Sequence, residues 1–290
     1  MNGRELFVDN FAGGVGESQS AGALREKNGG DCVMGKIKCE LHHDNFQNYK
    51  RYNIPRAQLV IADIPYNLGK NAYASNPMWY IGGDNKNGES KKAESAFFNG
   101  DGDFNLNEYF HFCGKLLKKE PKERGEAPCM IVFCSFEQMA HLIEIARSHG
   151  YLHYIPLVFV KNYSAQVLKA NMKIVGATEY ALVLYRNKLP KFRNGGHMVF
   201  NHFEWKRDST KEYPKIHPTQ KPVSVIRRLI EIFTDPGDVV IDPCAGSGST
   251  LRAALESGRN SYGFEISRKY YTEAKTRMLD ASQMRLSQEG

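Results

Sequence analysis

Residues 239–250 read VVIDPCAGSGST, an apolar run that leads directly into a turn of small residues. Such a run is typical of a buried strand. Gly246 and Gly248 let the backbone of the turn approach a ligand closely, and the helix expected after the turn presents free N–H groups at its start. The Walker lysine is absent and residue 251 is Leu, so neither common phosphate-binding fingerprint is met. The stretch therefore predicts a strand–turn–helix unit with a nucleoside pocket rather than a phosphate cradle.

A carboxylate follows this unit at a spacing that suits ribose binding. Glu265 lies about 17 residues after the turn, near the end of the next apolar run, SYGFEI (residues 261–266). A carboxylate at that point can accept hydrogen bonds from both hydroxyls of a ribose. The turn and the carboxylate together indicate an adenosine-containing cofactor. The alternative is a tight strand-to-helix turn with a solvated glutamate.

Apolar runs and amphipathic stretches alternate along much of the chain. Besides the two runs above, strands are predicted at residues 36–45, 58–67, 129–134, 155–161 and 179–186. Helices are predicted at residues 46–52, 106–119, 136–149 and 223–234, and a last helix near the end. This alternation indicates an α/β fold with a doubly wound, mostly parallel sheet.

A second motif, DIPY (residues 63–66), ends the apolar run that begins at Gln58. Asp63 is expected to be ionised, and Pro65 holds Ile64 extended so that its carbonyl points in a fixed direction. Tyr66 offers an aromatic face for stacking on a base. An exocyclic amine of a base is a poor nucleophile until two acceptors hold its hydrogens and stabilise the growing positive charge. The motif predicts transfer to such an amine; alternatively, Asp63 caps a turn while the proline and tyrosine pack.

Composition narrows the class of protein. The chain has 290 residues, of which 41% are hydrophobic, and no apolar run approaches the roughly 20 residues of a membrane span. Its net charge of +7 favours a polyanionic partner. The six cysteines contain no C-x-x-C pair, which makes a reducing cytoplasm the expected location. The spacing of Cys32, Cys39, His42 and His43 matches no tetrahedral site, so no metal is expected.

The stretch HPTQKPVSVIRRLIEIFTDPGDVVIDPCAGSGST (residues 217–250) resembles the C-terminal block of bacterial DNA methyltransferases that modify the amino groups of adenine or cytosine. Because DIPY precedes this block, the motif order resembles the circularly permuted β class. The resemblance covers roughly residues 36–69 and 129–282. It implies a Rossmann-like methyltransferase fold, S-adenosylmethionine as cofactor and double-stranded DNA as partner. A role in restriction–modification is one biological setting that it allows.

The resemblance also implies roles for single residues. The catalytic tetrad would be Asp63, Ile64, Pro65 and Tyr66, with Tyr66 receiving a base flipped out of the duplex. The cofactor pocket would be formed by Asp44, Thr219, Lys221, Asp242, Cys244, Ala245, Gly246, Ser247, Gly248 and Glu265. Ile64 and Cys244 depart from the commoner Pro and Phe. Asp at the first tetrad position favours adenine-N6 over cytosine-N4 as the methylated atom.

The expected organisation has four parts. Residues 1–35 are expected to be a flexible N-terminal segment, 36–187 the catalytic half with a loop insertion at 67–103, and 217–290 the cofactor-binding half. Residues 188–216 contain seven Lys or Arg against three acids and are the candidate target-recognition segment. Arg193, Lys206 and Arg207 are its candidates for contacting DNA.

Other interpretations stay open at this point. The same motifs fit a cytosine-N4 methyltransferase, which only the reaction product distinguishes from an adenine enzyme. They also fit a non-catalytic nucleic-acid-binding module on the same fold, or an enzyme that acts on RNA. The protein could be a monomer or a homodimer.

Overall fold

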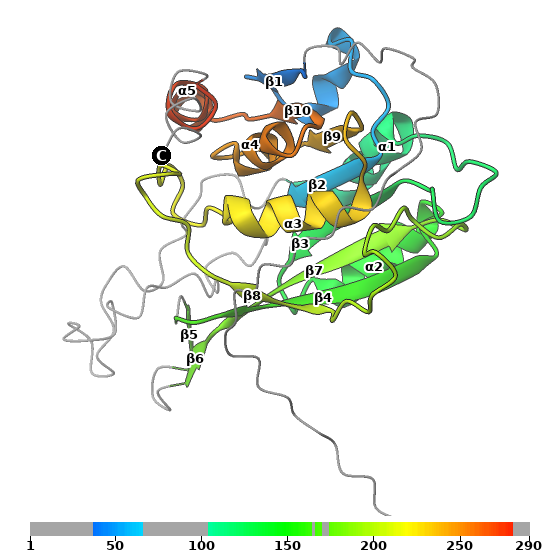
Figure 1. Ribbon diagram of the computed structural model, residues 1–290, viewed down its shortest axis with the longest axis horizontal. Coiled ribbons are helices and arrows are strands. Elements are labelled where there is room, and N and C mark those ends of the chain that lie inside the picture. The colour runs from blue at the N-terminus through cyan, green and yellow to red at the C-terminus, as the bar shows by residue number, and fades with distance from the viewer. Residues whose placement is uncertain (1–36, 66–103, 164–165, 170–173, 281–290) are drawn as a thin grey trace, which may run out of the picture. The chain divides into compact units, whose positions relative to one another are not determined.

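Two apolar strands, β2 (Leu59–Asp63) and β9 (Val239–Asp242), lie side by side in an eight-stranded sheet (Figure 1). In the computed structural model the described residues are 37–65, 104–163, 166–169 and 174–280. The order across the sheet is β1 (Cys39–His42), β10 (Asn260–Phe264), β9, β2, β3 (Cys129–Cys134), β7 (Thr178–Tyr185), β4 (His153–Lys161) and β8 (His202–Trp205). The predicted apolar runs thus form strands. Tyr66 and the segments 1–35 and 67–103 lie outside the described residues.

Most neighbouring strands run parallel, which confirms the predicted fold class. The first five strands in this order pair in parallel, whereas β7 is antiparallel to both of its neighbours. β8 pairs in parallel with β4. It lies inside the candidate target-recognition segment (residues 188–216, hereafter the basic segment), where no strand was expected. A separate two-stranded sheet consists of β5 (Gln166–Lys169) and β6 (Ile174–Gly176), between β4 and β7 in sequence.

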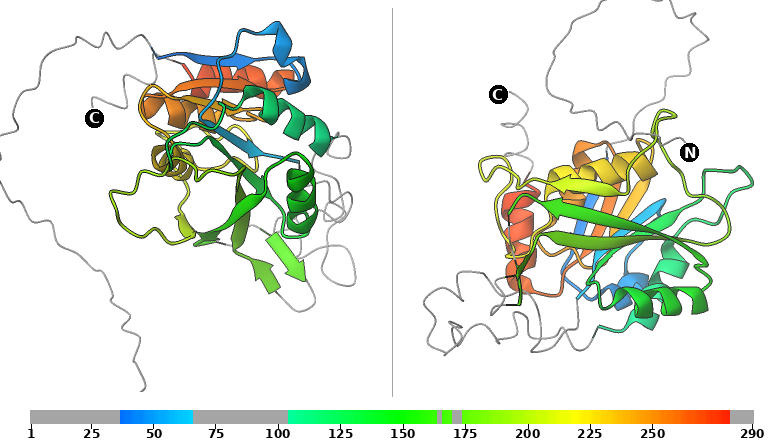
Figure 2. Two further views of the ribbon diagram at one scale, coloured as in Figure 1. Left: turned by 90° about the vertical axis from the view of Figure 1, so that its right-hand side faces the viewer. Right: turned by 90° about the horizontal axis from the view of Figure 1, so that it is seen from below.

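Helices cover both faces of the sheet (Figure 2). One layer contains α1 (Leu106–Leu116), α2 (Met139–Ser148) and the 3-10 helix η1 (Phe46–Arg51); the other contains α3 (Val223–Phe233) and α4 (Ser249–Glu256). Side chains of a strand alternate between faces. Accordingly, Leu59 and Ile61 of β2 join the core under α3 and α4, while Val60 and Ala62 join the core under α1. Helix α5 (Arg268–Glu273) continues into the π-helical turn η6 (Ala274–Met278).

The chain winds outward in both directions from the β9–β2 pair. From β9 it passes through α4 to β10 on one side, and from β2 through α1 to β3 on the other. In open α/β sheets ligands bind at the carboxyl ends of the strands where the winding direction changes. The ends of β2 and β9 are therefore the expected place for a ligand.

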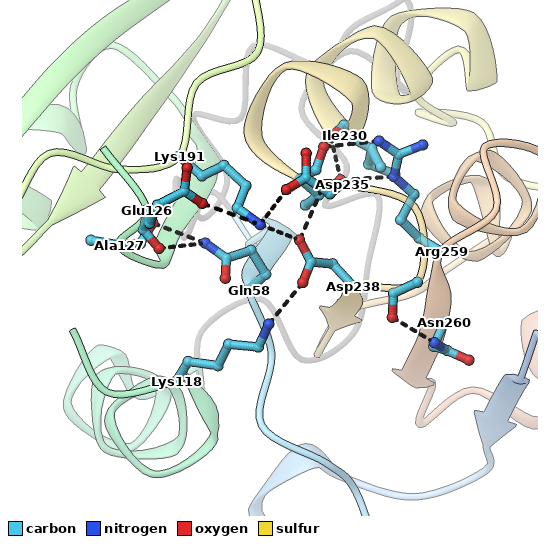
Figure 3. A network of polar contacts seen from close by, with 12 residues as sticks. Gln58, Lys118, Glu126, Ala127, Lys191, Ile230, Asp235, Asp238, Arg259 and Asn260 are labelled. Carbon is cyan, nitrogen blue, oxygen red and sulfur yellow. Dashed lines mark hydrogen bonds and ion pairs between the residues drawn. The ribbon is translucent and has the colours of Figure 1, made fainter. Parts of the chain in front are cut away.

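At the opposite edge, where these strands begin, polar side chains join several segments (Figure 3). Asp238, just before β9, accepts hydrogen bonds from Lys118 Nζ at 2.7 Å and Lys191 Nζ at 2.8 Å. Gln58, just before β2, donates to the carbonyl of Ala127 at 2.9 Å. Arg259 is buried and donates to Thr234 Oγ1 at 2.9 Å. These contacts fix the amino edge of the sheet.

No helix in the part of the chain that the structure describes is long and apolar enough to cross a membrane.

Candidate active site

The carboxyl ends of β2 and β9 each carry an aspartate. Asp63 ends β2, and its side chain is 30% exposed. Asp242 ends β9 and is buried. Lys221, from the turn before α3, places its Nζ 2.8 Å from Asp63 Oδ2. The side-chain amide of Gln220 holds this turn, because its Oε1 accepts from the backbone N–H of Ile216 at 2.9 Å.

Behind Asp63, three more charged groups form a buried row. Lys221 Nζ also lies 3.1 Å from Glu179 Oε2 on β7, and Lys161 on β4 is hydrogen-bonded to Glu179 Oε1. The side chains of Lys221 and Lys161 are only 8% and 5% exposed. Buried charges require partners of opposite sign, and here two lysines alternate with two carboxylates.

Aromatic rings enclose the two lysines. Lys221 Nζ lies 5.2 Å from the ring centroid of Phe133 and 5.7 Å from that of Trp205. Lys161 Nζ lies 5.0 Å from the Trp205 centroid. These distances suit cation–π attraction. Trp205 is the last residue of β8, so the basic segment contributes directly to this site.

Burial and the neighbouring charges in this row together shift the pKa values of Asp63, Glu179 and Lys221. Burial raises the pKa of Asp63, and the Lys221 ammonium opposes that rise. Burial also acts to raise the pKa of Glu179, but Lys221 and Lys161 outweigh it and hold that pKa at about 2. Burial acts to lower the pKa of Lys221, and Asp63 and Glu179 reverse the effect and keep it above the ordinary value. Lys221 and Glu179 are therefore charged at neutral pH.

The turn after β9 has the conformation that its glycines permit. Gly246 and Gly248 have φ angles of +51° and +79°, which side-chain-bearing residues rarely adopt. Asp242 Oδ1 accepts from the backbone N–H of Cys244 at 2.9 Å. Burial raises the pKa of Asp242 to about 7 against this hydrogen bond and one from Thr250. Ala245 N–H donates to the carbonyl of Phe264 at 2.8 Å, which ties the turn to the end of β10.

Glu265 makes a second connection between β10 and this turn. Its Oε2 accepts from Gly246 N–H at 2.8 Å and its Oε1 from Ser267 N–H at 2.6 Å. Burial raises its pKa against these hydrogen bonds. Each carboxylate oxygen has two lone pairs, so both can still accept a hydroxyl. An adenosine-containing cofactor therefore fits this turn and its carboxylate.

The remaining cofactor candidates lie in different surroundings. Asp44 accepts from Asn48 Nδ2 at 2.7 Å and from the Tyr52 hydroxyl at 2.9 Å, and these contacts lower its pKa. Asp44 thus stabilises the predicted helix η1, a role for Asp44 that the sequence did not indicate. Thr219 is exposed, with its Oγ1 3.0 Å from His217 Nδ1. Ser247 and Ala245 are buried in the turn itself.

The three DNA candidates do not lie together. Arg193 lies at the amino edge, where its guanidinium pairs with Asp235 and Glu126, each at 2.7 Å. Lys206 and Arg207 follow β8 at the carboxyl edge. The Arg207 guanidinium lies 3.7 Å from the ring centroid of Tyr163, and Lys206 is largely exposed. Arg193 is therefore remote from Asp63, because Asp235 precedes β9 and Glu126 precedes β3, whereas Asp63 lies at the carboxyl end of β2.

Sequence reasoning missed several residues of this edge. Glu179 and Lys161 are charged residues at the ends of apolar runs, and that position was their only signal. Gln138 lies three residues after Ser135, and the two exchange hydrogen bonds with each other's backbone N–H at 3.2 Å, as in a capping box. Gln138 Nε2 also donates to the carbonyl of Pro65 at 3.0 Å. The end of β3 thereby holds the backbone that follows Asp63.

Comparison with known proteins identifies the family. The model of the N6/N4 methyltransferase family, described as DNA methylase, matches residues 57–276. The chain belongs to this family of DNA methylases, as its motifs indicate. The DNA adenine methyltransferase YhdJ of Escherichia coli (strain K12) is 26% identical over 262 residues, which cover 81% of this chain and 80% of YhdJ.

Two solved structures confirm the methyltransferase fold. M1.HpyAVI in complex with SAM has a TM-score of 0.58 at 21% identity, covering 82% of this chain and 98% of the other. The cytosine-N4-specific PvuII DNA methyltransferase has a TM-score of 0.55 at 15% identity, covering 87% and 94% of the two chains.

Proposed function

We propose that this protein transfers a methyl group from S-adenosylmethionine to the exocyclic N6 amino group of adenine in double-stranded DNA. The observation that carries the proposal is the position of Asp63. It ends β2 at the carboxyl edge, next to the strand that leads into the glycine turn, and it is paired with Lys221. A hydrogen-bond acceptor thus stands beside the strand that leads into the proposed cofactor turn.

The glycine turn holds the cofactor in this proposal. Asp242, Cys244, Ala245, Gly246, Ser247 and Gly248 line its pocket, and Glu265 accepts the ribose hydroxyls. We assign Asp44 and Thr219 to the margins of this pocket from the motif resemblance. When bound, S-adenosylmethionine supplies a methyl group on a positively charged sulfur. The N–H groups at the start of α4 and the close approach of the backbone suit the polar end of a nucleoside.

Asp63 and the carbonyl of Ile64 accept hydrogen bonds from the target amine. Ile64 is buried and Pro65 is held through Gln138, so the backbone here has little freedom to move. Two fixed acceptors stabilise positive charge on the nitrogen as its lone pair forms the new bond to carbon and the carbon–sulfur bond breaks, its electron pair staying on sulfur. The nitrogen then releases one proton to Asp63 or to water. Tyr66 stacks on the extruded base. The main contribution to rate is the in-line placement of the amine.

The choice of adenine rests on Asp at the first tetrad position, and the name of YhdJ supports it. Contact with duplex DNA falls to Lys206 and Arg207, which extend from β8 at the carboxyl edge. Arg193 is left out of this role because it lies at the amino edge of the sheet, where Asp235 and Glu126 pair with its guanidinium.

The test is product identification. The purified protein is incubated with unmethylated duplex DNA and labelled S-adenosylmethionine, the DNA is digested, and the nucleosides are identified by mass spectrometry. N6-methyldeoxyadenosine is expected. Detection of N4-methyldeoxycytidine instead would mean that cytosine, not adenine, is the target. Methylation of RNA but not of DNA would overturn the choice of DNA as substrate.

The Asp63→Ala variant tests the catalytic role directly. We expect it to lose turnover by about 100-fold or more, because one of the two acceptors is removed, while its affinity for S-adenosylmethionine stays near wild type. Glu273→Gln is the matched control, since it neutralises a carboxylate that only pairs with Arg277 within one helical turn. Normal turnover in Asp63→Ala would refute the role of Asp63.

A further inference from the structure

Glu179 occupies a central position behind the proposed catalytic aspartate. Its two carboxylate oxygens face different lysines: Oε1 bonds Lys161 and Oε2 lies 3.1 Å from Lys221. Lys221 in turn reaches Asp63 Oδ2. Glu179 is therefore linked to Asp63 through the ammonium group of Lys221, which lies between the two carboxylates.

Stability alone does not explain such a row. Taking charges out of water is costly, and well-packed apolar residues often serve as well or better. Phe133, Phe159 and Trp205 already surround these positions. A buried row of charges that ends on a half-exposed carboxylate at a ligand-binding edge is instead typical of a functional site.

We propose that Glu179 is a positioning residue for methyl transfer, which holds the Lys221 ammonium against Asp63 Oδ2 so that Asp63 presents its other oxygen, Oδ1, to the target amine. This inference rests on the proposed function, because it gives Asp63 the amine as its partner. It also reassigns Lys221, which the motif resemblance places in the cofactor pocket.

The geometry favours Asp63 over the cofactor as the group that Lys221 serves. Two carboxylates lie within 3.1 Å of Lys221 Nζ, on β2 and on β7. Phe133 and Trp205 face the same ammonium. A lysine held from two sides in this way has a fixed direction, which a hydrogen-bonded catalytic carboxylate needs.

Several titratable groups face this pair and enter its pH dependence. Lys221, Glu179 and Lys161 influence the pKa of Asp63. Burial is the main cause of the raised pKa values of Cys134, Asp242 and Cys244, and the Asp63 charge adds to it. Burial lowers the pKa of His217, and the Lys221 charge adds to this effect. Removal of Lys221 takes a cation away from Asp63, so the acid limb of the kcat profile should move to higher pH. Removal of the Glu179 charge takes an anion away and should not move that limb upward.

The experiment compares Glu179→Gln, Lys221→Met and the double variant, with Glu273→Gln as the control for loss of a surface carboxylate. DNA methylation is measured at saturating cofactor across pH, and S-adenosylmethionine binding is measured by calorimetry. We expect Glu179→Gln to lower the plateau kcat by about tenfold while the cofactor Kd stays within about twofold. Because Glu179 acts through Lys221, the double variant should match Lys221→Met within about twofold.

Two results would overturn the proposal. One is a Glu179→Gln enzyme with normal kcat and weakened cofactor binding, which would make Lys221 a cofactor ligand. The other is additive loss in the double variant, which would give Glu179 an independent role. If Glu179→Gln does not fold, Lys161→Met replaces it, with an expected loss of about threefold in kcat and unchanged cofactor binding. A normal kcat in Lys161→Met would then refute the proposal that the buried charges behind Asp63 position it. If wild-type protein methylates no DNA, the proposed function fails instead.

Discussion

At Gly263 on β10 there is no room for a side chain. An added Cβ would lie 2.7 Å from Leu251 Cδ1 and 3.1 Å from the Cβ of Ala245 in the glycine turn. We expect Gly263→Ala to lower the free energy of unfolding by about 1–3 kcal/mol, since the buried neighbours must shift. S-adenosylmethionine binding should weaken as Ala245 moves.

Urea denaturation and calorimetry measure both effects. Gly114→Ala in α1 is the control, because its Cβ would meet only Arg186 at an ordinary 3.5 Å. That variant should keep or gain stability, by up to about 1 kcal/mol. Equal behaviour of the two variants would contradict the account of close packing at Gly263.

Asp242 makes stability depend on pH in an unusual direction. Burial raises its folded-state pKa to about 7, from an ordinary value of 3.8. Between these values the folded protein binds a proton that the unfolded chain lacks, so this group's contribution is present at low pH and is lost as pH rises toward 7. Asp242→Asn should remove that loss.

The measurement is urea denaturation of wild type and Asp242→Asn at pH 5 and pH 8. The stability of the variant relative to wild type should rise by about 2–3 kcal/mol over this interval. A constant difference between the two proteins would show that Asp242 titrates normally.

Among single residues, those that end strands were predictable and those that meet across the sheet were not. Asp63, Asp242 and Glu265 follow apolar runs, and carboxyl ends of parallel strands share one edge. Glu179 and Lys161 reach Lys221 only because β7 and β4 adjoin β3 in the sheet. Neighbours of that kind depend on strand order, which a local pattern does not contain.

At the scale of elements, the turn between β3 and α2 supports the backbone of the proposed catalytic motif. Gln138 serves two functions there: its Oε1 accepts from Ser135 N–H, and its Nε2 donates to the Pro65 carbonyl. Gln138→Glu keeps the acceptor and removes the donor. We expect kcat to fall by about tenfold, because the carbonyl of Pro65 then faces a carboxylate.

Ser135→Ala is the companion variant, since it removes only the hydroxyl that accepts from Gln138 N–H. It should lower stability by about 1 kcal/mol and leave kcat near wild type, as judged by thermal unfolding and the methylation assay. If Gln138→Glu also kept its kcat, the link to Pro65 would have no role in catalysis.

The direction of β7 and the existence of β8 show where element prediction ends. An apolar run reads the same in a parallel and an antiparallel strand, so residues 179–186 predicted a strand but not its reversal. β8 is short, with the sequence HFEW, and Lys206 and Arg207 follow it directly. Its alternation of polar and apolar residues was therefore not recognised as a strand among the charged residues of this segment. The core helices and the other predicted strands have regular apolar patterns and were found where expected, whereas β5 and β6 were not predicted.

At the scale of the whole molecule, the two edges of the sheet have separate tasks. The carboxyl edge carries the site, and the amino edge carries the ion pairs of Asp238, Lys191 and Arg193. We therefore expect Arg193→Ala to lower stability by up to about 1 kcal/mol, as is usual for a half-exposed ion pair, with DNA affinity unchanged.

Arg207→Ala should weaken DNA binding several-fold and reduce its salt dependence.

Fluorescence anisotropy with duplex DNA at several salt concentrations, together with urea denaturation, measures both variants. The opposite outcome, a loss of DNA affinity in Arg193→Ala alone, would place the DNA on the amino edge and contradict the arrangement proposed for β8.

The pairing of β2 with β9 has a consequence for biosynthesis. Leu59 and Val240 are partners although about 180 residues separate them in the chain. Contacts of such long range form slowly and only after the later strand has left the ribosome. Until then, β2 offers an unpaired edge on the nascent chain that is apolar from Leu59 to Ala62, which is where we expect chaperones to bind and truncated translation products to aggregate.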